Sequence, residues 1–142
     1  MRSEIAECCK RLRLSKNIVT MSEEVQGDTY QEYLLQILKS EVFYRQQRRR
    51  DILIKQAGFY SLKTFDGYSF EDIRLPVGLG VTDLKDGGFI EQKENLVFYG
   101  NVGTGKTHLA IAIGLEACKR GQKVLFYRTA ALVSCLSRPK SS

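Results

Sequence analysis

The chain has 142 residues, 43% of them hydrophobic and 27% charged, which is ordinary for a globular protein and excludes collagen-like and low-complexity chains. No apolar run approaches the length of a membrane span and the N-terminus lacks a signal-peptide core, so we expect a cytoplasmic protein with no membrane partner. The formal net charge of +6 is compatible with nucleic acid as a partner without being diagnostic of it. Cys8, Cys9, Cys118 and Cys135 form no C-x-x-C pair, so we expect free thiols rather than a metal site.

Residues 1–58 are predicted to form a helical N-terminal region. Its first stretch places four apolar residues on one helical face: Ile5, Cys8, Cys9 and Leu12. Further along, Ser22 is followed by Glu23 and Glu24. Because acidic residues favour the first turn of a helix, this order predicts that a second short helix begins there.

A long helix is predicted next, from Tyr30 to about Ala57. Thr29 and Glu32 fit a capping box at its start, and Gly58 is a typical residue just beyond a helix end. The first half of the helix carries an apolar stripe of the kind that packs on a core. This stripe consists of Tyr33, Leu34, Ile37, Leu38 and Val42.

The middle of this helix changes character, because residues 45–51 include no apolar side chain. We therefore expect the stretch to face solvent on all sides. Its arginines, Arg45, Arg48, Arg49 and Arg50, are candidates for contacts with DNA phosphates, which carry no sequence information. The alternative is a solvated helix face, which is what most charge runs are. No helix-turn-helix or zinc-finger pattern supports base readout.

Residues 59–94 differ in composition and are predicted to form a linker and lead-in with short elements. The stretch is rich in Phe, Tyr, Gly and Asp. We expect four apolar residues to anchor it to the core that follows: Leu62, Phe65, Tyr68 and Phe70. Aromatic rings at such a position can also pack on an adenine, although plain core packing is the commoner use.

A glycine-rich stretch between residues 100 and 107 reads G-x-x-x-x-G-K-T, the pattern of a phosphate-binding P-loop. Its eight residues, all candidate nucleotide contacts, are Gly100, Asn101, Val102, Gly103, Thr104, Gly105, Lys106 and Thr107. The glycines allow backbone N–H groups to approach phosphate oxygens closely. Lys106 would supply positive charge at the β- and γ-phosphates of ATP, and the Thr107 hydroxyl would coordinate Mg²⁺.

The context of this loop favours the phosphate-binding interpretation over an ordinary glycine-rich turn. The apolar run Asn95–Tyr99 before it is short enough for a buried parallel strand. After the loop, small and apolar residues recur at helical spacing until Gly121, a typical stop. These residues are Leu109, Ala110, Ile113, Gly114 and Ala117.

A second buried strand is predicted at Lys123–Arg128, parallel to the first by the right-handed βαβ rule. Thr129 is then positioned to cap a further helix at residues 130–133. Residues 95–142 thus predict an α/β fold with a P-loop. A P-loop NTPase also needs a second acidic strand, Walker B, to hold Mg²⁺ and organise the attacking water. Because the second strand ends without an acid, we expect the front part of an ATPase, an incomplete nucleotide-binding core.

Several segments resemble the IstB-like ATP-binding proteins, helper ATPases of bacterial insertion-sequence transposition that are similar to the DnaC helicase loaders. They are the basic long helix ending in Lys55–Phe59, then Leu62–Phe65, and finally Leu96–Gly114. The resemblance covers about Glu4 to Leu132. It implies an AAA+ fold, a parallel αβα sandwich, with ATP and Mg²⁺ as cofactors. It also implies ATP-dependent assembly on DNA as a homo-oligomer and partnership with a transposase.

The sequence also departs from the family pattern. Walker B, the sensor residues, the arginine finger and the C-terminal lid are missing. The final ten or so residues do not resemble the family, as a frameshift or a truncated gene copy would give. We therefore expect this chain to bind phosphate but not to hydrolyse ATP by itself.

Two other interpretations stay open at this point. The chain could be a helicase loader of the same fold that acts in replication. A neighbouring replication gene would support this interpretation, whereas a neighbouring transposase gene would support the transposition helper. A non-functional remnant would fail to fold stably, so a cooperative thermal transition would argue against it. A small-molecule kinase is disfavoured by the long basic helical region that precedes the P-loop.

Overall fold

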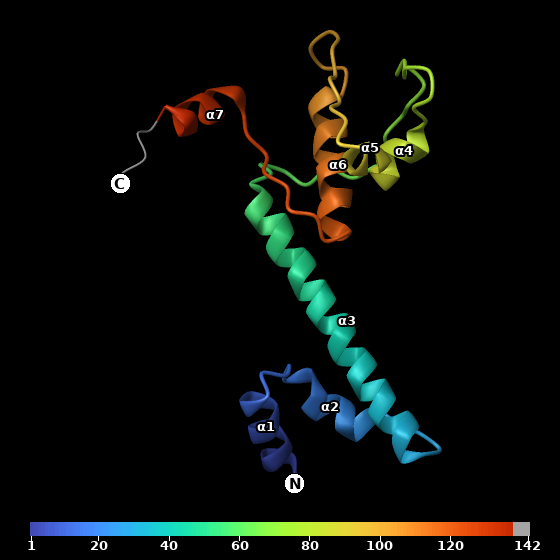
Figure 1. The fold of residues 1–142 in the computed structure, drawn as a ribbon, viewed down its shortest axis with the longest axis vertical. Coiled ribbons are helices and arrows are strands. Elements are labelled where there is room, and N and C mark those ends of the chain that lie inside the picture. The colour runs from blue at the N-terminus through green and yellow to red at the C-terminus, as the bar shows by residue number, and fades with distance from the viewer. Residues whose placement is uncertain (138–142) are drawn as a thin grey trace. The chain divides into compact units, whose positions relative to one another are not determined.

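The computed structural model describes residues 1–137, and its regular elements over that range are helices (Figure 1). They are α1 (Arg2–Arg11), α2 (Asn17–Glu24), α3 (Tyr30–Ala57), α4 (Val81–Asp86), α5 (Gly88–Glu91), α6 (Lys106–Lys119) and α7 (Thr129–Leu136). The chain divides into two compact units, Met1–Asp51 and a second unit that begins at Ile52. None of the helices in the described range is long and apolar enough to cross a membrane.

Local signals set the ends of α3, and the predicted bounds Tyr30–Ala57 are confirmed. At its start, the Thr29 hydroxyl accepts a hydrogen bond from the Glu32 N–H at 3.1 Å, and the Glu32 carboxylate accepts one from the Thr29 N–H at 3.2 Å. This reciprocal pair is the capping box that the sequence predicts. Gly58, with φ of 76°, adopts the left-handed conformation that ends the helix.

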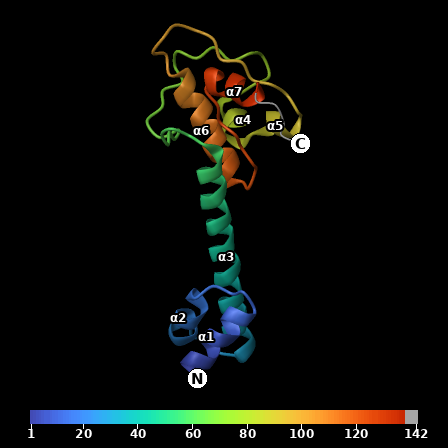
Figure 2. The ribbon, with the colours of Figure 1, turned by 90° about the vertical axis from the view of Figure 1, so that its left-hand side faces the viewer.

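The first unit has a small core at the contact of α1, α2 and the N-terminal half of α3 (Figure 2). Its buried residues are Cys9, Ile18 and Ile37, with Tyr33 partly buried against them. The predicted apolar stripe is therefore only partly used. Leu34, Leu38 and Val42 stay about half exposed, because the two short helices cover one narrow side of α3.

The predicted start of the second short helix is also wrong. α2 runs from Asn17 to Glu24, so Ser22 and its two acidic neighbours lie at its C-terminal end. The Ser22 hydroxyl donates a hydrogen bond to the Val19 carbonyl at 2.8 Å and caps no N–H group. A serine can bond backward within a helix as well as forward at a cap, and here the backward bond forms.

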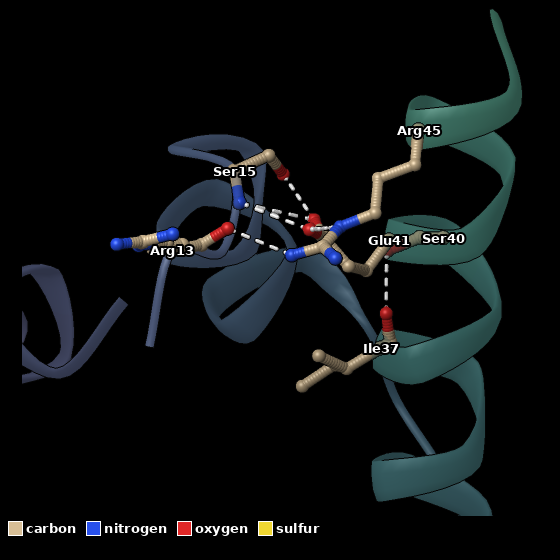
Figure 3. A network of polar contacts seen from close by, with 6 residues as sticks. All are labelled: Arg13, Ser15, Ile37, Ser40, Glu41 and Arg45. Carbon is tan, nitrogen blue, oxygen red and sulfur yellow. Dashed lines mark hydrogen bonds and ion pairs between the residues drawn. The ribbon is translucent and has the colours of Figure 1, made fainter. Parts of the chain in front are cut away.

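A buried carboxylate fastens the loop after α1 to α3 (Figure 3). Glu41 is 5% exposed, and its oxygens accept hydrogen bonds from the N–H and hydroxyl of Ser15. Arg45 Nε donates to Glu41 at 2.7 Å, and a second Arg45 nitrogen donates to the Arg13 carbonyl at 2.7 Å. Burial by itself would raise the pKa of Glu41, but these hydrogen bonds and the Arg45 charge lower it below its ordinary value.

The second unit is built around α6, which buries half of its residues. They are Leu109, Ile111, Ala112, Ile113, Leu115, Ala117 and Cys118. Leu84 of α4 is fully buried against this helix, and the lead-in rings of Phe65, Tyr68 and Phe70 pack on the same core. The predicted anchoring role is confirmed for these three rings. It is wrong for Leu62, which is 63% exposed.

The predicted strands at Asn95–Tyr99 and Lys123–Arg128 are not formed among the described residues. Neither segment forms a ladder there, so the predicted parallel αβα sandwich is not confirmed. Side-chain burial nevertheless alternates along the first segment: Leu96 and Phe98 are partly buried, whereas Val97 and Tyr99 are exposed. A strand requires a paired neighbour for its N–H and C=O groups, whereas alternation requires only one core to pack against. Here α6 and its surroundings supply the core without a paired strand.

The last described helix, α7, begins at Thr129 itself, so this residue is helical rather than a cap. The predicted helix is confirmed, although all of its side chains are exposed. Of the final ten or so residues, where we expected the family resemblance to fade, 138–142 lie outside the described part of the chain.

Candidate phosphate-binding site

The glycine-rich loop follows segment 96–99, where the predicted strand is not formed, and it leads into the first turn of α6, where a helix is predicted. Gly103 and Gly105 have φ of 86° and 79°, a left-handed conformation that strains any other residue. Gly105 is also the N-cap of α6. The loop therefore ends at a helix N-terminus, where free N–H groups and the positive end of the helix dipole favour an anion.

Lys106, the first residue of α6, turns its ammonium back onto the loop. Its Nζ donates to the carbonyls of Gly100 at 2.9 Å and Asn101 at 2.6 Å, and to the Thr104 hydroxyl at 3.4 Å. An ammonium group has three N–H donors, so each has a partner here. The longest and weakest of these bonds, to Thr104, is the one that a phosphate oxygen would replace most easily.

The two threonines of the motif have different surroundings. The Thr104 hydroxyl donates to the Asn101 carbonyl at 2.9 Å and so braces the loop internally. Thr107 is exposed in the first turn of α6. Its hydroxyl is therefore accessible to a ligand, and this is the oxygen predicted to hold a metal ion.

A cavity of about 350 Å³ opens beside this loop. Gly100, Thr104 and Lys106 of the motif line it at one side. The remaining lining residues are Tyr68, Asp72, Ile73, Arg74, Val97, Phe98, Tyr99 and Leu109. The site thus combines a positively charged loop with apolar walls, which suits a ligand with a charged end and a flat apolar part.

Tyr68 and His108 connect the lead-in segment with the loop. The Tyr68 hydroxyl donates to the Gly105 carbonyl at 3.4 Å, and its ring lies 4.9 Å from the His108 ring, centroid to centroid. His108 Nε2 lies 2.8 Å from the Thr64 carbonyl oxygen. Burial raises the pKa of Tyr68, which keeps its hydroxyl protonated and able to donate.

Three polar residues of this site were not predicted from the sequence. Asp72 and Arg74 line the cavity from a lead-in with no regular pattern, so no local signal placed them there. His108 directly follows the motif, and this adjacency is the one signal that pointed to it. The eight motif residues form one continuous loop and helix start, as predicted, but only three of them line the cavity.

The four candidate DNA-contacting arginines lie along the middle of α3, and the structure separates them by surroundings. Arg45 is engaged with Glu41 and the Arg13 carbonyl, so it has a role inside the first unit. Arg48 and Arg49 are exposed, and Arg50 is partly buried.

A glycine loop that leads through lysine and threonine into a helix is the arrangement of the P-loop class of nucleotide-binding proteins. The profile of the family described as IstB-like ATP binding protein matches residues 9–142. The chain belongs to this family. The match runs past Leu132, so the expectation that the resemblance ends there is wrong.

Individual relatives agree with the family match. The chain is 36% identical to a protein of Geobacillus stearothermophilus named as an ATP-binding protein of insertion sequence IS5376, over 97% of this chain and 57% of the relative. It is 35% identical to a Pseudomonas aeruginosa protein named likewise for insertion sequence IS21, over 78% of this chain and 42% of the relative. The chain spans about half the length of these relatives.

Proposed function

We propose that this chain is an ATP-binding component of insertion-sequence transposition that acts on DNA in the cytoplasm together with a transposase. The observation that carries the nucleotide part is the loop Gly100–Thr107, whose left-handed glycines and Lys106 end at the N-terminus of α6. The family and the names of its relatives support the transposition part. Assembly into a homo-oligomer on DNA belongs to the same proposal.

In this proposal each motif residue has a defined task. The loop backbone and Lys106 hold the triphosphate, and the apolar walls of the cavity receive the base and sugar. Thr107, exposed in the first turn, would hold Mg²⁺, whose chemistry is to neutralise phosphate charge. A hydroxyl oxygen is a ligand that Mg²⁺ accepts, so the donor chemistry at this position fits the ion.

The test is a titration with a fluorescent ATP analogue. Lys106→Ala should weaken binding by at least about a hundredfold, since it removes a desolvated charge contact. Lys123→Ala is the matched control, because Lys123 is an exposed lysine of the same unit outside the cavity. Equal affinity of the Lys106→Ala variant and the unchanged chain would remove the phosphate-binding assignment.

Hydrolysis by this chain alone is not part of the proposal. The described residues that line the cavity include one carboxylate, Asp72, and it comes from the lead-in rather than from a strand beside the loop. We expect phosphate release at saturating ATP and Mg²⁺ to be no faster than in Lys106→Ala. Lys106-dependent turnover near 1 s⁻¹, roughly the low end of ordinary enzyme rates, would contradict this. Asp72→Asn would then show whether Asp72 is the carboxylate responsible.

DNA contact is proposed at Arg48, Arg49 and Arg50, with Arg45 contributing less because it is engaged within the first unit. Replacing Arg48, Arg49 and Arg50 with Gln should make the slope of log K against log salt concentration shallower. The change should correspond to the loss of up to about three phosphate contacts. Arg45→Gln alone should change that slope little. If the chain is not retained on DNA at low salt, the arginine cluster of α3 is only a solvated helix face.

A further inference from the structure

We propose that His108 is a positioning residue that docks the lead-in segment 64–68 onto the P-loop and couples the position of this segment to nucleotide binding. The coupling rests on the proposed ATP-binding function, whereas the docking does not. The segment lies in the second unit, as do α6 and the loop, so every contact used below is internal to one compact unit.

The first contact is the hydrogen bond between the His108 ring and the Thr64 carbonyl, 2.8 Å long. A carbonyl oxygen can only accept, so the ring must carry a proton on Nε2. That N–H exists both in one neutral tautomer and in the imidazolium ion. The bond therefore acts as a structural tether between α6 and the lead-in segment.

The second contact is made by the Tyr68 ring, which lies tilted against His108 on the same turn of α6. Its ring lies beside the His108 ring and so close to Gly105 that a Cβ there would be 3.1 Å from the ring. Its hydroxyl reaches the Gly105 carbonyl. Gly105 is the residue whose left-handed conformation sets the direction of the loop into α6. Tyr68 therefore rests on the backbone point at which the loop and the helix meet.

Phosphate binding would take place directly beside this point, because Lys106 follows Gly105 in the chain. All three Lys106 donors are bonded to the loop, so a phosphate oxygen has to take over at least one of them. This exchange would take place next to the Tyr68 ring, which contacts Gly105. If ATP prefers the docked arrangement, ATP must stabilise docking, and docking must raise the affinity for ATP by the same factor.

Plain packing is the competing explanation, since Phe65 and Phe70 hold Tyr68 in the core as well. A packing role predicts that His108 variants lose stability but show no specific link between nucleotide and segment. The two explanations differ in what happens at the peptide bond between Lys63 and Thr64. Lys63 is exposed, and the bond lies at the edge of the docked segment, so trypsin cleavage there reports undocking.

The experiment is limited trypsin digestion of the full chain, with cleavage after Lys63 measured by mass spectrometry relative to cleavage after exposed Lys123. Without nucleotide, His108→Ala should speed cleavage after Lys63 about three- to tenfold, the loss expected for one hydrogen bond. His108→Gln places an amide N–H at a similar reach and should restore most of the protection. If His108→Ala does not change the rate of cleavage after Lys63, the tether is overturned. It is also overturned if His108→Gln still unfolds cooperatively but does not restore protection at this bond.

The nucleotide arm separates this inference from the proposed function. In the unchanged chain, a non-hydrolysable ATP analogue with Mg²⁺ should slow cleavage after Lys63 at least about threefold, and His108→Ala should bind the analogue more weakly by a comparable factor. Binding without any change at Lys63 would overturn the coupling while leaving ATP binding intact. Failure of the unchanged chain to bind the analogue would overturn the proposed function and the coupling together.

Discussion

The two units of this chain are stabilised by different means. The first unit buries three apolar residues and one carboxylate, Glu41, whose hydrogen bonds fix the loop after α1. The second unit buries seven residues of α6 alone, all apolar or small, and adds aromatic rings from the lead-in. A small helical unit thus depends on one polar network, whereas the unit with the candidate site depends on apolar packing.

This difference follows from how much surface each unit has available to bury. Two short helices against one side of α3 provide little apolar area, so directional bonds carry more of the specificity. α6 is covered on several sides, so burial itself suffices, at roughly 1.5–3 kcal/mol for each large side chain. Changes to packing should therefore damage the second unit most, and changes to charge should damage the first.

The largest effect is expected for Leu84→Ala, which opens a cavity against Leu109 and Ile113 in the second unit. Such truncations cost about 2–5 kcal/mol. Leu62→Ala is the control, since Leu62 is mostly exposed and should cost less than about 0.5 kcal/mol. Urea unfolding followed by circular dichroism measures both. Similar midpoints for the two variants would contradict the dependence of this unit on packing.

A smaller effect is expected for Glu41→Gln, about 2 kcal/mol, because Ser15 and Arg45 would lose a charged acceptor. Glu24→Gln, an exposed acid of the same unit, is the control. The loss should be confined to the first unit. A Glu41→Gln chain as stable as the Glu24→Gln chain would show that the polar network does not hold this unit together.

The same carboxylate predicts the response of the first unit to pH. The pKa of Glu41 is lower in the folded state, so its stabilisation is complete above the unfolded pKa, near 4.3. It is lost as the pH falls through the lower, folded value. Unfolding followed from pH 7 to pH 3 should show the unchanged chain losing stability in this acid range. Glu41→Gln, which cannot titrate there, should show a correspondingly flatter profile.

The smallest perturbation uses the thiols already present. Cys9 is buried in the first unit and Cys118 in the second, whereas Cys8 and Cys135 are exposed. Burial also raises the pKa of Cys118, which lowers its thiolate fraction. We expect two fast and two slow alkylations, the slow ones at least roughly tenfold slower. If the first unit opens more easily, low concentrations of urea should accelerate the alkylation of Cys9 before that of Cys118. The opposite order would show that the second unit opens first.

Local chemistry made part of this structure predictable. The capping box at Thr29 and the glycine at residue 58 fixed both ends of α3, because such signals act within a few residues. The start of α6 after the glycine loop was predictable for the same reason, since the glycines and Lys106 are adjacent in sequence. The start of α2 was not, because a serine can bond forward as a cap or backward within a helix, and Ser22 bonds backward to the Val19 carbonyl.

The sequence by itself therefore determined the long helix, the glycine loop with its lysine, the helix after it and the family to which the chain is assigned. Tertiary structure decided that one narrow side of α3 is buried, that Glu41 is buried there together with Ile37, and that Asp72 and Arg74 reach the cavity. It also decided that the two β-patterned segments stay unpaired in the described residues. Helix ends and loops depend on neighbours within a few residues, whereas burial and strand pairing depend on which distant segments supply a partner.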